Sequence, residues 1–250
     1  GQSIFYGGFP MRTAIVTGGS TGIGADICRH LLDGGYKVLN VSRRDSPLDH
    51  PGLHNYAADL SDPEATREVA ARIAAEHQVT DIVHNAGVIR PALLGSVEIA
   101  DLEMLTHIHV GAAITLAQAC LEQLRGCGNG RIVLISSRAA MGLETRTCYS
   151  ATKSGMVGMA RTWALELADQ GITVNVVAPG PIAETEMFEA VIPQGSEKED
   201  QVANSIPVRR LGNPADVSRA VQFFLDPQNS FVTGQTLFVC GGASIGSLSL

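Results

Sequence analysis

The chain carries the stretch Thr13-Ala14-Ile15-Val16-Thr17-Gly18-Gly19-Ser20-Thr21-Gly22-Ile23-Gly24, in which a glycine-rich turn follows directly on an apolar run. The β-branched residues of this run predict a strand over 13–17, and the apolar spacing after the turn predicts a helix over 22–32. Glycines let a pyrophosphate approach the backbone, and the first N–H groups of a helix attract an anion. The turn therefore predicts a dinucleotide site; the alternative is a turn that uses glycine for steric reasons alone. Its candidate cofactor-binding residues are Gly18, Ser20, Thr21, Gly22, Ile23 and Gly24.

The rest of the chain alternates between short apolar runs and longer helical stretches. Further strands are predicted over 37–41, 81–84, 131–135, 172–177 and 236–239, and helices over 63–76, 102–124 and 149–168. Strands without polar alternation are buried on both faces, which is typical of a parallel sheet with helices on each side. We predict an α/β fold: a single Rossmann-type, doubly wound parallel sheet of about seven strands.

This one domain is expected to span residues 12–250, with residues 1–11 as an N-terminal extension or a remnant of cloning. No Pro/Ser-rich linker and no internal repeat divides it. The charged stretch 184–205 follows a predicted strand and is expected to be a solvated loop or a mobile lid.

Composition excludes several classes of protein. Hydrophobic residues make up 45% and charged residues 17%, which indicates a well-buried core. The net charge of −7 argues against a nucleic-acid partner. No run approaches the ~18 apolar residues of a membrane span, and residues 1–10 lack the basic residues of a signal peptide. Five cysteines without zinc spacing indicate free thiols, a reducing cytoplasm and no metal site.

Five motifs in fixed order identify a family resemblance. Besides Thr17–Gly24, they are His84-Asn85-Ala86-Gly87, Ser136-Ser137 followed by Tyr149-Ser150-Ala151-Thr152-Lys153, Asn175-Val176-Val177-Ala178-Pro179-Gly180, and Gly234-Gln235-Thr236. From about residue 12 to 243 the chain resembles the short-chain dehydrogenase/reductase family, in its branch of about 250 residues that includes 3-oxoacyl-[acyl-carrier-protein] reductase-like members. The resemblance also implies a homotetramer, paired through the helices near 102–124 and 149–168.

Tyr149 and Lys153 are the candidate catalytic pair. Four residues apart on a helix, they share one face. A free phenol has a pKa near ~10, and a lysine cation close by is expected to lower the pKa of Tyr149 toward the working range. The resemblance makes Tyr149 the acid/base, Lys153 also a ligand of the nicotinamide ribose, and Ser137 the residue that orients the carbonyl. Ser136 is the alternative serine, and a surface Tyr/Lys pair is the alternative interpretation.

His109 is where the chain departs from the family. The resemblance aligns it with an asparagine whose backbone holds a water that links the lysine to solvent. The imidazole could carry protons as a modified relay, it could pack without a chemical role, or its presence could weaken catalysis. His84, which replaces the first Asn of an NNAG motif, is expected to be structural.

The residues after the second strand predict the cofactor. Ser42 stands where NAD enzymes usually carry an acid, and Arg43 and Arg44 follow it. Guanidinium groups suit a 2′-phosphate, so NADP(H) is favoured and NAD(H) remains possible; two solvated arginines are the alternative. The resemblance adds contacts to adenine, phosphates and nicotinamide, with Thr185 one position later than usual. These residues are Asp59, Leu60, Asn85, Ala86, Gly87, Pro179, Gly180, Ile182 and Thr185.

Together these observations predict an NADP(H)-dependent oxidoreductase that transfers a hydride between nicotinamide and a ketone/secondary alcohol pair. The alternative is a non-catalytic, dinucleotide-binding or sensing protein of the same fold. The substrate is expected to be a small carbonyl or alcohol compound. Its pocket is expected to include Arg138, Met141, Leu143, Glu144 and Cys148.

Overall fold

The computed structural model describes residues 5–6 and 9–245. Its centre is a seven-stranded, all-parallel sheet in the order β5-β4-β3-β6-β7-β8-β9. The strands are β3 (Thr13–Thr17), β4 (Lys37–Ser42), β5 (Leu53–Ala57), β6 (Asp81–His84), β7 (Arg131–Ile135), β8 (Thr173–Pro179) and β9 (Thr236–Val239). The order reverses between β3 and β6, which is where open α/β sheets bind ligands. The predicted doubly wound sheet is confirmed.

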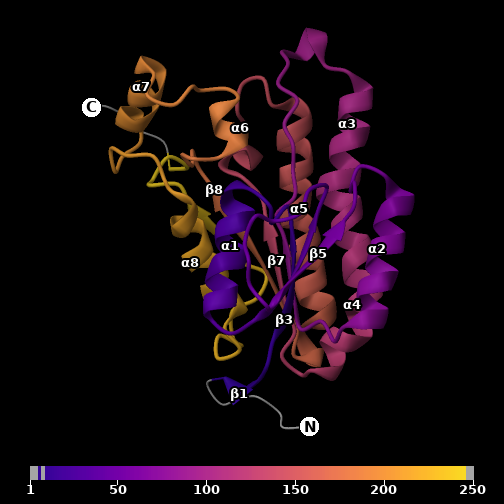
Figure 1. The fold of residues 1–250 in the computed structure, drawn as a ribbon. Helices are drawn as coiled ribbons and strands as arrows, with labels where there is room; N and C mark the ends of the chain where they lie inside the picture. Colours follow the sequence, from indigo (N-terminus) through magenta and orange to yellow (C-terminus); the bar gives the residue numbers. More distant parts are fainter. Residues whose placement is uncertain (1–4, 7–8, 246–250) are drawn as a thin grey trace.

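Helices cover both faces of this sheet (Figure 1). α1 (Gly22–Asp33) and α8 (Pro214–Leu225) pack on one face. α2 (Pro63–Glu76), α4 (Ala112–Gly126) and α5 (Thr147–Leu167) pack on the other. The helical run that leads into α4 consists of α3 (Ile99–Leu105) and a π-helical turn, η2 (Thr106–Gly111).

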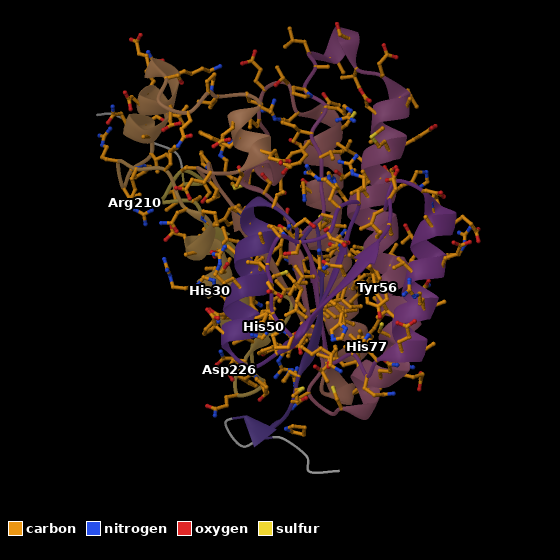
Figure 2. All side chains as sticks on the ribbon, in the orientation of Figure 1. His30, His50, Tyr56, His77, Arg210 and Asp226 are labelled. Carbon is orange, nitrogen blue, oxygen red and sulfur yellow. The ribbon has the colours of Figure 1, made fainter. Side chains whose placement is uncertain are left out.

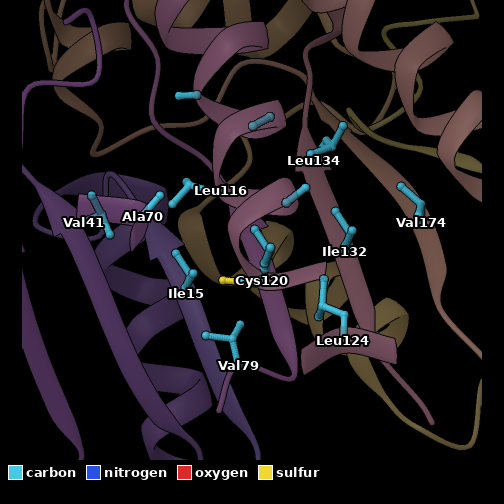
Figure 3. Packing of buried hydrophobic residues seen from close by; sticks show 14 of the residues in the cluster. Ile15, Val41, Ala70, Val79, Leu116, Cys120, Leu124, Ile132, Leu134 and Val174 are labelled. Carbon is cyan, nitrogen blue, oxygen red and sulfur yellow. The ribbon is translucent and has the colours of Figure 1, made fainter. Parts of the chain in front are cut away.

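The core consists of two aliphatic layers, one on each face of the sheet. Between the sheet and α2, α4 and α5, the fully buried side chains include Ile15, Leu116, Cys120 and Ile132 (Figure 3). The layer under α1 and α8 contains residues such as Ile27, Leu31, Val217, Val221 and Phe224. Both layers follow from strands that are apolar on both faces.

The helical run 99–126 has the length and hydropathy to cross a membrane, although the sequence shows no long unbroken apolar stretch. Leu116, Cys120 and Leu124 form one stripe of this run and are fully buried against the sheet. Its apolar character is therefore explained by its position in the core.

Several elements differ from the sequence predictions. β5 and α8 were not predicted, β8 extends to Pro179, and α5 begins at Thr147. The stretch 184–205, expected as a loop or lid, contains two short helices, α6 (Glu186–Glu189) and α7 (Glu197–Ser205). Within the segment expected to be an extension, β1 (Phe5–Tyr6) and β2 (Phe9–Pro10) form an antiparallel pair.

Candidate active site

The glycine turn between β3 and α1 leaves no room for a side chain at Gly18 or Gly24. Gly18 has a φ of +65°, and a Cβ on Gly24 would lie 2.0 Å from the Gly18 carbonyl oxygen. Thr21 precedes α1 without a side-chain cap, and the first turn carries no acidic residue. The positive end of the helix dipole is thus unopposed, which fits a bound pyrophosphate.

Asn40, a buried amide on β4, holds this turn in place. Its Oδ1 accepts hydrogen bonds from the backbone N–H of Gly19 (3.0 Å) and from the hydroxyl of Ser42 (2.8 Å). Its Nδ2 donates to the hydroxyl of Ser20 (3.1 Å) and to Asn55 (2.9 Å). Asn40 is not among the residues predicted from the sequence, although one amide between the apolar residues Leu39 and Val41 was a readable signal.

Thr17 and His84 join the glycine turn to the end of β6, where the two residues lie in register. The Thr17 hydroxyl accepts from the backbone N–H groups of Asn85 (2.9 Å) and Ala86 (3.0 Å). It lies 2.9 Å from His84 Nδ1, and His84 Nε2 donates to the carbonyl of Ile108 in η2 (2.8 Å). Because a carbonyl only accepts, His84 carries its hydrogen on Nε2 and accepts from Thr17 at Nδ1. Burial lowers the pKa of His84 to about 4, so the ring is neutral.

The residues expected to bind the adenosine half surround the end of β4. Arg43 and Arg44 are exposed, whereas Ser42 is half-buried. Arg44 pairs with Glu186 of α6 at 3.4 Å, and the Ser20 hydroxyl donates to the Arg44 carbonyl. The loop after β4 therefore lies beside both the glycine turn and α6.

Asp59 follows β5 and is exposed, whereas Leu60 is buried in the core. The Asp59 carboxylate accepts from the backbone N–H (3.0 Å) and hydroxyl (2.7 Å) of Ser61. These hydrogen bonds, with the nearby charge of Arg43, lower the pKa of Asp59. Asp59 is therefore an ionised acceptor at the same end of the sheet as the two arginines.

Tyr149 and Lys153 face one another on α5, as their spacing predicts. Lys153 is 2% exposed; its Nζ lies 5.5 Å from the centre of the Tyr149 ring and donates to the carbonyl of Ile135 (2.9 Å). Burial lowers the pKa of Lys153 to about 7. Burial raises the pKa of Tyr149, against smaller lowering effects from a hydrogen bond with Ser137 and the charge of Arg146. The expected net lowering of the pKa of Tyr149 is therefore wrong in this structure, because desolvation of the phenolate outweighs the neighbouring charge.

The two serines after β7 have different surroundings. The Ser136 hydroxyl donates to the carbonyl of Lys153 (2.8 Å) and is buried. Ser137 precedes the short helix η3 (Arg138–Met141), accepts from the Ala139 backbone N–H (3.0 Å), and lowers the pKa of Tyr149 through its hydroxyl. Of the two serines, Ser137 is therefore the one whose hydroxyl acts on the tyrosine.

His109 lies in η2 and is fully buried. Its Nε2 accepts from the backbone N–H of Val88 (3.2 Å), so its hydrogen is on Nδ1, 2.7 Å from the hydroxyl of Thr152. Burial and the charge of Lys153 hold the pKa of His109 far below its usual range. With both nitrogens bonded inside the protein and the ring neutral, the packing alternative fits better than a proton relay. The ring also meets Tyr149 edge-on, with 5.6 Å between ring centres.

Gly87, the last residue of the His84–Gly87 motif, faces the side chains of His109 and Lys153. A Cβ there would lie 2.9 Å from His109 Nε2 and 3.4 Å from Lys153 Nζ. Glycine is therefore required where the loop after β6 passes the buried histidine and lysine.

Of the nicotinamide contacts expected after β8, Thr185 lies beside the glycine turn, whereas Gly180 and Ile182 contact other segments. A Cβ on Gly180, after Pro179, would lie 2.8 Å from Cys240, and Ile182 is buried and bridged to Gly212. Thr185 caps α6 by accepting from Phe188 N–H (3.2 Å). Its methyl group lies 3.4 Å from the position of a Cβ on Gly22, so Thr185 faces the glycine turn.

α6 and α7 lie at the end of the sheet opposite β1 (Figure 1). From α6, Met187 places its sulfur 3.6 Å from the Tyr149 hydroxyl. The segment expected as a loop or lid therefore contacts the hydroxyl of Tyr149 directly.

The residues expected to form the substrate pocket differ in their exposure to solvent. Cys148 is buried and packs with Tyr149, Ala139 and Leu105. Met141 is 61% and Leu143 48% exposed, and Glu144 is also exposed. Half-buried Arg138 donates to the carbonyl of Gly142 (2.9 Å).

Other ionisable groups lie outside this site (Figure 2). Tyr56 and His77 lie on the α2 side, where the Tyr56 hydroxyl is 2.7 Å from His77 Nε2 and donates to Glu76 (2.6 Å). His30 and Arg210 lie on the opposite side, near α1 and α8. Within residues 5–6 and 9–245, no cluster of three or more His, Cys, Asp or Glu side chains could hold a metal.

Known proteins resemble the chain along nearly its whole length. A family model described as enoyl-(acyl carrier protein) reductase matches residues 18–244. Acetoacetyl-CoA reductase of Rhizobium meliloti is 37% identical, over 92% of this chain and 98% of the relative. The 3-oxoacyl-[acyl-carrier-protein] reductase FabG of Vibrio cholerae is 33% identical, over 92% and 96%.

Among solved structures, a Beutenbergia cavernae protein proposed as an NAD(P)-dependent gluconate 5-dehydrogenase, with NADP bound at low occupancy, superposes with a TM-score of 0.85. It is 31% identical, and the match covers 94% of this chain and 97% of that one. Fold, site geometry and relatives agree: the chain belongs to the short-chain dehydrogenase/reductase family and is an NAD(P)-dependent oxidoreductase.

Proposed function

We propose that the protein reduces a ketone to a secondary alcohol, or catalyses the reverse reaction, with NADP(H) and with Tyr149 as the acid/base. This proposal rests on one observation. Ser137, Tyr149 and Lys153 lie close together at the carboxyl end of the sheet, beside the glycine turn. A surface Tyr/Lys pair would not be buried with a serine bonded to the phenol.

The glycine turn, Asn85–Gly87 and the segment Pro179–Thr185 would hold the dinucleotide. When bound, reduced nicotinamide supplies a hydride to the carbonyl carbon of the substrate. Ser137 donates a hydrogen bond to the carbonyl oxygen and stabilises the charge that develops there. Tyr149 transfers its phenolic proton to that oxygen, and Lys153 lies close enough to stabilise the resulting phenolate.

The protonated form of Tyr149 is the form that reduction of a carbonyl requires. Because burial raises the pKa of Tyr149, the phenol holds its proton at neutral pH and is ready to donate it. Oxidation of an alcohol needs the phenolate, which burial disfavours and which Lys153 would have to stabilise.

His109 and His84 act in this proposal as positioning residues. His109 ties the loop after β6 to α5 through Val88 and Thr152. His84 supplies a donor to the Ile108 carbonyl within the π-helical turn, where the regular pattern of helix hydrogen bonds is broken.

NADP(H) is preferred over NAD(H) in our proposal because Arg43 and Arg44 are exposed and follow Ser42, which stands where NAD enzymes usually carry an acid. Arg44 pairs with Glu186, so Arg43 is the arginine that we expect to bind the 2′-phosphate. The NADP bound to the gluconate dehydrogenase-like structure is consistent with this preference. We further propose a homotetramer in the cytoplasm, whose reducing conditions suit five free cysteines.

Consumption of NADPH with a panel of ketones tests the proposal. The panel contains a 3-oxoacyl thioester, a keto sugar acid and a neutral cyclic ketone, each also assayed with NADH. We expect NADPH-dependent turnover of at least one member. NADPH binding without turnover on any of them would instead support the dinucleotide-sensing alternative.

A further inference from the structure

Arg146 is a cation beside the reactive tyrosine that the proposed chemistry does not use. It is half-buried and precedes α5 as its N-cap, three residues before Tyr149, so both residues belong to the same turn. A β-bridge between Ala92 and Arg146, and a hydrogen bond from Ala92 N–H to the Thr145 carbonyl (3.0 Å), fix its backbone. The Arg146 backbone is thus attached to the segment that follows the His84–Gly87 motif.

The chain before Arg146 is held in an unusual conformation. Thr145 has a φ of +65°, in the left-handed region that β-branched residues rarely adopt. Such strain persists where the surrounding structure enforces it, and it is concentrated at functional sites. Here it sets the direction in which the chain enters α5, and with it the position of Arg146.

Arg146 has no acidic partner among the described residues. Nine other arginines in that part of the chain form ion pairs, including Arg90, which pairs with Asp101 at 3.6 Å. The side chain of Arg146 donates to the neighbouring Thr145 hydroxyl, and a guanidinium has five N–H donors. Most of its hydrogen-bonding capacity therefore remains for a ligand.

Apart from Arg146, Ser137, His109 and Lys153, the side chains around the tyrosine are apolar. Leu105, Ala139, Cys148 and Tyr149 form one buried cluster, with Met187 packed against it. The charge of Arg146 reaches the Tyr149 phenol, which it stabilises in its ionised form. A site of this kind orients its ligand through the few polar groups that it contains.

We propose that the substrate carries a carboxylate, and that Arg146 binds this carboxylate while Ser137 and Tyr149 bind the carbonyl oxygen. The planar fork of a single guanidinium matches a carboxylate in geometry and in charge. The inference rests on the proposed function and narrows its substrate class to oxo acids and the corresponding hydroxy acids. Arg146 would then determine specificity through an end of the substrate that does not react.

Matched acids and esters test this proposal. NADPH-dependent reduction of acetoacetate and levulinate is compared with reduction of their methyl esters, which keep the ketone and lose the charge. For the parent protein we expect a higher kcat/KM for at least one acid than for its ester, and a smaller preference as salt concentration rises. In Arg146→Gln, kcat/KM for that acid should fall about 10- to 100-fold, while kcat/KM for the ester changes much less.

Two further variants keep the test decisive. Arg146→Lys retains the charge without the fork and should recover part of the preference for the acid. Arg161→Gln, at an exposed position of the same helix, should retain the full preference. NADPH affinity and Tm of each variant report whether it has folded.

Equal losses on acid and ester in Arg146→Gln would overturn the proposal, because Arg146 would then act through Tyr149 or the fold. An unchanged preference for the acid would also overturn it, as would a parent that reduces esters as well as acids. Absence of turnover with every ketone would contradict the proposed function itself, and turnover of the esters alone would contradict only the role of Arg146.

Discussion

Three buried basic residues of the candidate site have pKa values below those that they would have in water. His84, His109 and Lys153 are each at most 2% exposed. Because burial penalises the charged form, the pKa of each is lowered, to about 7 for Lys153 and to about 4 for His84. Both imidazole rings are therefore neutral, and each forms hydrogen bonds inside the protein.

The two histidines should make stability depend on acid pH. In the unfolded chain both titrate near ~6.5, whereas in the fold both stay neutral well below that pH. The unfolded state therefore binds more protons between pH 6.5 and about 4, and the free energy of unfolding falls as pH falls through this window. Each histidine should contribute up to about 1.4 kcal/mol per pH unit.

Urea denaturation between pH 7 and 5 measures this dependence. In His84→Asn the slope of stability against pH should decrease by about one proton, whereas His107→Asn, an exposed control, should leave the slope of the parent. If His84→Asn keeps the full slope, His84 is not the neutral, buried group described here.

Arg43 should distinguish the two nicotinamide cofactors. Loss of a guanidinium partner of the 2′-phosphate should cost on the order of 2–3 kcal/mol, or roughly a 30- to 150-fold loss of NADPH affinity in Arg43→Ala. NADH has no such phosphate, so its affinity should hardly change and serves as the control. Ser42→Asp should shift the preference toward NADH. Fluorescence titration measures both; equal weakening of NADPH and NADH in Arg43→Ala would contradict the NADP assignment.

At the scale of single residues, the sequence predicts which side chains lie close together but not whether they are ionised. The spacing of Tyr149 and Lys153 placed them on one face of α5, as found. It could not show that Tyr149 is buried deeply enough for desolvation to outweigh the neighbouring charges. Arg146 was missed for a related reason, since an arginine that lacks an acidic partner is recognised only after the fold has placed the acids.

At the scale of elements, the turn between β3 and α1 should be the segment least tolerant of added volume. A Cβ on Gly24 would lie 2.0 Å from the Gly18 carbonyl, so Gly24→Ala must displace the turn. We expect an overpacking cost of about 1–3 kcal/mol and a loss of NADPH affinity.

Gly158→Ala on α5 is the matched control, because a Cβ there meets nothing within 4 Å. It should leave NADPH affinity unchanged. Thermal unfolding and NADPH titration of the two variants make the comparison. If Gly24→Ala binds NADPH as the parent does, the glycine turn does not hold the pyrophosphate.

Elements were predicted where their hydrophobic pattern was strong. The central strands β3, β6 and β7 are buried on both faces and were predicted within a residue of their observed bounds. β5 was missed because it is an edge strand in which only Tyr56 is buried. α8 was missed although Asn213, Pro214 and Asp216 form a capping box with proline in the first turn, which is a readable start signal.

At the scale of the whole molecule, exposed apolar side chains indicate surfaces that another copy could cover. Leu165 on α5 is 86% exposed, and Phe223 on α8 is 48% exposed. We expect light scattering at micromolar concentration to give about four times the chain mass of 26.3 kDa. Leu165→Glu should lower that mass if α5 pairs with a second copy. A clean monomer for the parent would contradict the tetramer.

The central claim, that Tyr149 transfers the proton in an NADP(H)-dependent reaction, is tested most directly by Tyr149→Phe. The substitution removes one hydroxyl and leaves the ring that packs against His109 and Lys153. NADPH affinity and single-turnover reduction of the best ketone are measured for the parent and the variant. We predict unchanged NADPH affinity within a few-fold and a reduction rate about 100- to 10,000-fold lower. A rate within tenfold of the parent, with NADPH still bound, would contradict the account.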